Sequence, residues 1–71
     1  MKRVKVYRRL CAQMALRGVS ARMLASGMGM NYETLRQKLN GEHGFTLEEA
    51  LRAKRLLEYD ETVEKLFERA V

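Results

Sequence analysis

Apolar residues recur at three- and four-residue intervals along most of the chain, and this spacing predicts amphipathic helices. The first helix is expected from about Val4 to Arg17, and Gly18 stands where such a helix ends. Its apolar face is formed by Val4, Tyr7, Leu10, Cys11 and Met14. We therefore expect this face, including the single cysteine, to be buried in a helical core.

Two short helices separated by a glycine are predicted next. Ser20 is a good N-cap for a helix over about 21–28, which Gly29 ends, with Ala25, Met28 and either Met23 or Leu24 facing inward. Asn31 is a good N-cap for a helix over about 32–40, which Gly41 ends. Its buried side is formed by Leu35 and Leu39. The opposite side is polar and consists of Glu33, Arg36, Gln37 and Asn40.

The last third of the chain predicts two further helices. Thr46 and Glu49 have the spacing of a capping box, which starts a helix over about 47–58. Asp60 is the expected N-cap of a helix over about 61–70. The inward-facing positions are Ala50, Leu51, Ala53 and Leu57, with Leu56 as the alternative to Leu57, and then Val63, Leu66, Phe67 and Ala70. The pattern predicts an all-α fold with five helices in one domain, residues 1–71.

Charge divides the chain into a basic beginning and a mildly acidic end. Residues 1–22 contain seven bases and no acid, whereas residues 42–71 have a net charge of −3, within a total of +5. A basic segment of this kind suits a polyanion such as nucleic acid, although it also serves as a solvated helix face. Nucleic acid is the favoured partner for the first half of the chain.

The few chemically reactive side chains argue against an enzyme. With one cysteine, one histidine and no glycine-rich phosphate loop, the chain lacks the residues for a zinc site or a nucleophile–base pair. We expect no metal, no cofactor and no small-molecule ligand. A single cysteine fits a reducing, cytoplasmic location, and no run of apolar residues is long enough for a membrane helix.

Residues 21–40 resemble the helix-turn-helix of the lambda-repressor/Cro family. That family has a small residue, a glycine and an aliphatic residue at the fifth, ninth and fifteenth positions of the unit, where this chain has Ala25, Gly29 and Leu35. Its other apolar positions are matched by Leu24, Met28, Met30 and Leu39. The resemblance continues from Leu39 through the capping box and over residues 60–67. The sequence departs from the family pattern at three places. Gly27 lies inside a predicted helix, and Lys54 stands where an apolar residue is common. Glu42 and His43 stand where relatives often carry basic residues.

The resemblance implies a sequence-specific regulator that binds double-stranded DNA with its third helix in the major groove. The implied base-reading residues are Asn31, Tyr32, Glu33, Arg36 and Gln37. Glu33 is expected either to accept a hydrogen bond from cytosine or to orient Arg36. The implied phosphate contacts are Ser20, Arg22, Lys38, Asn40, Lys2, Arg3 and Lys5.

Such a unit reads only a few base pairs, so a homodimer on a pseudo-palindromic operator is expected. The fifth-helix residues Leu66, Phe67 and Ala70 are candidates for its interface, or else they complete the monomer core. A compact phage-type or mobile-element repressor is the favoured role. The alternative is a helix-turn-helix that binds protein, as an antitoxin, adaptor or inhibitor, in which case the third helix should expose apolar side chains.

Overall fold

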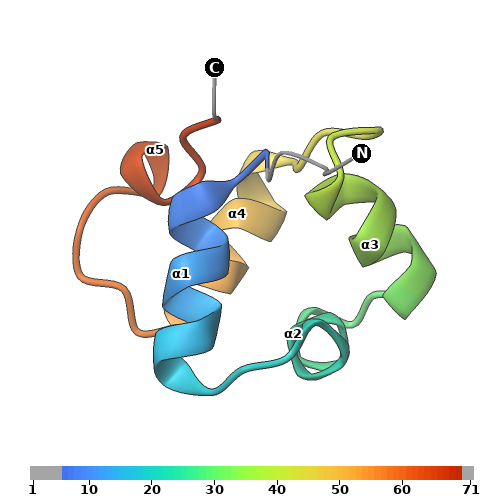
Figure 1. Ribbon diagram of the computed structural model, residues 1–71, viewed down its shortest axis with the longest axis horizontal. Helices are drawn as coiled ribbons and strands as arrows, with labels where there is room; N and C mark the ends of the chain where they lie inside the picture. Colours follow the sequence, from blue (N-terminus) through green and yellow to red (C-terminus); the bar gives the residue numbers. More distant parts are fainter. Residues whose placement is uncertain (1–5, 70–71) are drawn as a thin grey trace, which may run out of the picture.

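Five helices follow one another in the computed structural model, which describes residues 6–69. They are α1 (Arg8–Arg17), α2 (Ala21–Met28), α3 (Tyr32–Leu39), α4 (Leu47–Leu56) and α5 (Val63–Leu66), and no strand occurs among the described residues. α1 lies across α4, with α2 and α3 to one side and α5 to the other (Figure 1). The prediction of an all-helical fold is confirmed.

The core is built from leucines contributed by all five helical segments. Five leucines are almost completely buried, one each from α1, α2, α3, the residue after α4, and α5: Leu10, Leu24, Leu35, Leu57 and Leu66. Each stabilises the fold by roughly 1.5–3 kcal/mol relative to an exposed side chain. Around them, the rings of Tyr7, Phe45 and Phe67 meet edge to face, with centroids 4.9–5.8 Å apart.

The starts of α2, α3 and α4 are fixed by the predicted caps. Ser20, Asn31 and Thr46 accept hydrogen bonds from backbone N–H groups of the first helical turn, and Thr46 and Glu49 form the predicted capping box. The fifth helix begins differently. Thr62, not Asp60, is its N-cap and accepts a hydrogen bond from the Lys65 N–H.

α1, α2, α3 and α4 end in the same hydrogen-bonded arrangement. One residue after the helix adopts the left-handed conformation, and the backbone N–H groups of this residue and the next donate hydrogen bonds to the last carbonyls of the helix. At α2, for example, the N–H groups of Gly29 and Met30 donate to the carbonyls of Ser26 and Ala25. After α1, α2 and α3 the left-handed residue is a glycine: Gly18, Gly29 and Gly41. After α4 it is Glu58, with a φ of 52°, and a side chain makes that conformation costly.

The structure also corrects several boundaries and inward-facing positions. α1 begins at Arg8 rather than Val4, because Tyr7 has a non-helical backbone and packs its ring on the aromatic cluster. α4 ends at Leu56 and α5 at Leu66, both earlier than predicted. Leu51 is 44% exposed and Cys11 only half-buried, so neither is a full core residue. The sequence left two inward-facing positions undecided, Met23 or Leu24 and Leu56 or Leu57. Leu24 and Leu57 are the buried members of these pairs, and Met23 and Leu56 are exposed.

Gly27, which departs from the family pattern, lies beneath a side chain of α4. A Cβ at this position would be 2.9 Å from Cδ1 of Leu56. Leu56 would have to move to admit any larger residue. The glycine therefore allows Leu56 to lie against α2 at the point where α2 packs on α4.

We expect Glu58→Gly to raise the free energy of unfolding by about 1 kcal/mol, because glycine adopts the left-handed conformation without steric cost. Urea denaturation followed by circular dichroism measures this change. Glu58→Ala is the matched control, since it removes the carboxylate but keeps the Cβ. Equal stabilisation by alanine and glycine would show that the charge, not the backbone conformation, is responsible.

A second stability prediction concerns Tyr59, which is 7% exposed and whose hydroxyl is buried without a hydrogen-bond partner among the described residues. A buried hydroxyl of this kind costs about 1–3 kcal/mol. Tyr59→Phe should therefore leave the protein at least as stable as the wild type in thermal unfolding. A clear loss of stability would mean that the hydroxyl has a partner.

Candidate functional site

α2 and α3 form the part of the molecule that carries the predicted site. The Ser20 hydroxyl accepts a hydrogen bond from the Met23 N–H at 3.1 Å, and the Asn31 side-chain oxygen accepts one from the Glu33 N–H at 2.8 Å. Gly29, with a φ of 66°, reverses the chain between the two helices. Leu35 is fully buried and attaches α3 to the core. The two N-caps, the turn at Gly29 and the burial of Leu35 together determine the position and orientation of α3.

The outward side of α3 is polar, as predicted. Glu33 and Arg36 are exposed, and Gln37 and Asn40 are half-buried. We call these four residues the outer face of α3. Tyr32 is partly buried against the core rather than projecting freely. The outer face therefore presents carboxylate, guanidinium and amide groups to solvent, without exposed aliphatic side chains.

Glu33 and Arg36 form an ion pair within the outer face. The Arg36 Nε donates to Glu33 Oε1 at 3.3 Å, and its terminal nitrogen donates to Oε2 at 2.6 Å. This hydrogen bond lowers the pKa of the Glu33 carboxyl and raises that of the guanidinium, so both remain charged at neutral pH. Of the two predicted contacts of Glu33, the structure shows the one with Arg36.

Arg22 and Tyr32 bring the first turns of α2 and α3 together. The Arg22 guanidinium carbon lies 4.2 Å from the centre of the Tyr32 ring, over its face. Arg22 and Ser20 remain exposed. A guanidinium and a tyrosine ring thus lie together where the first turns of α2 and α3 meet.

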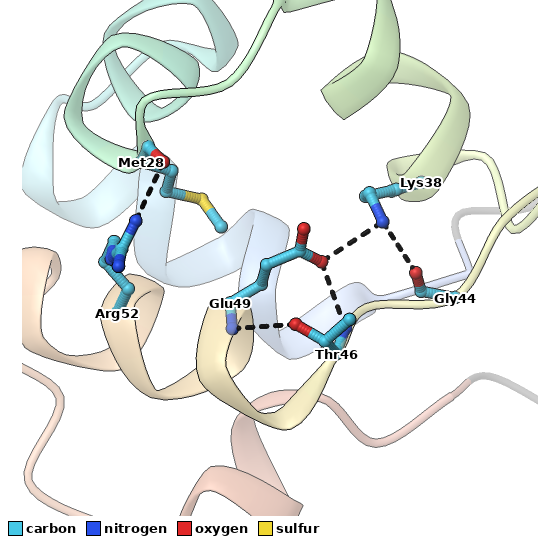
Figure 2. A network of polar contacts seen from close by, with 6 residues as sticks. All are labelled: Met28, Lys38, Gly44, Thr46, Glu49 and Arg52. Carbon is cyan, nitrogen blue, oxygen red and sulfur yellow. Dashed lines mark hydrogen bonds and ion pairs between the residues drawn. The ribbon is translucent and has the colours of Figure 1, made fainter.

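Lys38 is in a different place from the one predicted. Its side chain is only 12% exposed, and its ammonium donates to the Gly44 carbonyl at 2.9 Å and contacts Glu49 Oε1 at 3.1 Å (Figure 2). The same Glu49 oxygen accepts the Thr46 N–H of the capping box. Lys38 therefore joins α3 to the start of α4, and this removes it from the expected phosphate contacts.

Arg52 makes a corresponding link from α4 to α2. Its guanidinium donates to the carbonyl of Met28, the last residue of α2, at 3.2 Å (Figure 2). It also contacts the Glu48 carboxylate at 3.5 Å. The Met28 carbonyl is one of the groups that a helix end leaves without an internal partner. α4 thus holds both α2 and α3 through charged side chains.

The remaining predicted residues divide into two groups. Leu66 is fully buried and so belongs to the core, which leaves no part of it for contact with a second copy. Phe67 is partly buried in the aromatic cluster. Lys2, Arg3, Lys5 and Ala70 lie outside the described residues.

Two residues at the site were missed by the sequence analysis. Thr34 is exposed on α3, beside the outer face, and with Thr46, Glu48 and Arg52 it lines a shallow groove between α3 and α4. A helical projection of residues 32–39 would have identified Thr34 as exposed. The contact of Arg52 with α2 has no sequence signal, because it depends on how α4 packs.

Comparison with known proteins adds no relative, since no family model, curated protein or solved structure matches this chain significantly. Two properties of residues 6–69 bear on the chemistry. No helix there combines the length and apolar character needed to cross a membrane. No three acidic, histidine or cysteine side chains are grouped there so that they could hold a metal ion.

The contacts of Glu49 predict a pH-dependent contribution to stability. Partial burial raises the pKa of this carboxyl, but the Thr46 N–H and the Lys38 ammonium together outweigh it and hold the pKa below its usual value. A carboxyl with a lowered pKa stabilises the fold above its unfolded pKa of about 4.3, and this stabilisation is lost as pH falls through the folded value.

Glu49→Gln should therefore lower the free energy of unfolding by about 1 kcal/mol at pH 7, and the difference from wild type should shrink below pH 4. Urea denaturation at several pH values measures both effects. Glu48→Gln is the matched control, because the Glu48 side chain is 84% exposed and should change stability little. A difference for Glu49→Gln that is constant with pH would contradict the assignment.

Proposed function

We propose that the chain binds double-stranded DNA in a sequence-specific manner and regulates transcription, with residues 21–39 acting as a helix-turn-helix. The observation that carries this proposal is the outer face of α3, where hydrogen-bonding side chains project from a helix whose other side is anchored by the buried Leu35. An α-helix fits the major groove, and side chains of this kind recognise base edges there. In this proposal α3 is the recognition helix.

The roles of the outer face follow from its chemistry. Arg36 can donate two hydrogen bonds to guanine O6 and N7, and Gln37 can pair with adenine N6 and N7. Glu33 keeps the Arg36 guanidinium extended along α3 before DNA binds, since two hydrogen bonds connect them. Asn31 and Tyr32, at the first turn, complete the proposed base-reading set.

Phosphate binding is assigned to the edge formed by the first turns of α2 and α3. Arg22 supplies a positive charge, and Ser20 lies at the start of α2, where free N–H groups favour an anion. Asn40 lies at the other end of α3. Lys2, Arg3 and Lys5 remain proposed phosphate contacts on sequence grounds alone.

A single unit of this size would read only a few base pairs, so the proposal includes a homodimer on a pseudo-palindromic operator. We assign it the role of a cytoplasmic repressor. The competing role, a module that binds another protein through α3, is disfavoured because the outer face exposes no aliphatic side chain. Exposed leucines do occur on α4, however, away from the outer face.

The proposal is tested by selecting a binding site from randomised duplex DNA and measuring affinity for that site. Arg36→Ala should weaken binding by about 1–3 kcal/mol, or roughly five- to 160-fold, and relax the preference at one base pair. Gln37→Ala should act similarly at a neighbouring base pair. Both effects are measured by titration of labelled duplexes at a fixed salt concentration.

Arg9→Ala is the matched control for loss of charge. Arg9 is an exposed arginine of α1 that lies 3.8 Å from Glu68, beyond α5, away from the outer face. It should change affinity little and leave the base preference intact. Recovery of no motif, or equal losses in Arg36→Ala and Arg9→Ala on all sequences, would contradict sequence-specific reading by α3.

A further inference from the structure

An apolar stripe on α4 remains open to solvent although α4 is the central helix of the fold. Leu47 and Leu51, one helical turn apart, are 67% and 44% exposed. They project on a different side of α4 from Arg52 and Leu56, the residues that contact α2. The stripe therefore faces away from α2.

The stripe borders a groove between α4 and α5 that is mostly apolar. Leu47, Ala50 and Val63 line the groove together with all three rings of the aromatic cluster. The polar side chains of Thr46, Glu64 and Arg69 also line it. Isolated exposed leucines are ordinary on protein surfaces, but apolar side chains that adjoin a groove of this kind mark an interaction site. We call Leu47, Leu51 and this groove the α4 face.

The charges along the α4 face are arranged so that the face complements itself. Glu48 lies in the first turn of α4, where its exposed carboxylate also contacts Arg52, and Lys54 and Arg55 lie in the last. Residues 48 and 55 lie on one flank of the Leu47–Leu51 stripe, and residue 54 lies on the other. When two copies of the helix pack antiparallel about Leu51, residue 48 of one copy therefore lies opposite residue 55 of the other. Lys54 and Arg55 take part in no ion pair within residues 6–69, which leaves them available to the partner's acid.

We propose that the α4 face is the surface through which two copies of this chain associate, with α4 of each copy antiparallel to α4 of the other. Leu51 lies near the two-fold axis, Leu47 of each copy packs against the aliphatic stem of the other copy's Lys54, and Glu48 pairs with the other copy's Arg55. This replaces the interface predicted on the fifth helix, where Leu66 is buried.

The size of the α4 face sets the expected strength of association. α4 has ten residues and is therefore about 15 Å long, so that even with the groove the interface lies below the roughly 1,200 Å² of stable complexes. Association should be concentration-dependent, with a Kd on the order of tens of micromolar. This dimer is the one that the proposed function requires, but its evidence and its test do not involve DNA.

Sedimentation equilibrium of the full chain, without DNA, tests the proposal. Protein concentrations of about 5–500 µM bracket the Kd expected for a small interface. The wild type should change from monomer to dimer across this range. Leu47→Glu/Leu51→Glu should remain monomeric, while its circular dichroism spectrum stays helical because both side chains are already exposed. Leu16→Glu is the matched control, since Leu16 is a more exposed leucine, at 74%, on α1, and this variant should dimerise as the wild type does.

A charge exchange tests the antiparallel arrangement separately. Glu48→Arg and Arg55→Glu should each weaken association at least tenfold, and the double variant Glu48→Arg/Arg55→Glu should restore it. A wild type that stays monomeric throughout, or a double-glutamate variant that still dimerises, would overturn the α4 interface. Failure of the charge exchange to restore association would overturn the antiparallel arrangement.

The outcomes remain separate from those of the DNA experiment. A monomer that still selects a DNA motif overturns the α4 interface and leaves the proposed function standing. A protein that dimerises through the α4 face but selects no DNA motif overturns the proposed function and leaves the α4 interface standing.

Discussion

Attachment to α4 is the constraint on which the arrangement of α2 and α3 depends. Each of these helices has eight residues, and helices of this length are unstable in isolation. Their position must therefore come from tertiary contacts. The Lys38–Glu49 pair connects α3 to the start of α4, and the Arg52 hydrogen bond to Met28 connects α4 to the end of α2. Since the capping box of α4 uses the same Glu49 oxygen, the start of α4 and the position of α3 are determined together.

This arrangement changes how the positive charge of the chain should be understood. The net charge of +5 counts every base equally, but Lys38 is largely buried in an ion pair and Arg52 is bonded to the Met28 carbonyl. Arg17 donates to the Glu58 carbonyl at 3.2 Å. Arg22 and Arg36 are the exposed arginines of α2 and α3. Among the described residues, the outer face of α3 and its edge are therefore less basic than the composition implies.

Local signals in the sequence predicted much of the fold, and the failures have physical causes. Caps and glycines act within one helical turn, so Ser20, Asn31 and Thr46 were identified correctly. Asp60 and Thr62 are both good N-caps, and only packing selects between them. Periodicity placed Leu51 on an apolar stripe but could not show that no other element covers it. At the site, the polar side of α3 followed from spacing, whereas the burial of Lys38 required knowledge of where α4 lies.

The close approach of Leu56 to Gly27 has a consequence for the motions of the molecule. Glycine within a helix lowers its intrinsic stability by roughly 1 kcal/mol relative to alanine, so α2 depends on α4 more than its length alone would suggest. Amide hydrogens of α2 should therefore exchange through local opening, at a lower free energy than those of α1. Because α3 packs on α2, such opening would also loosen the outer face of α3.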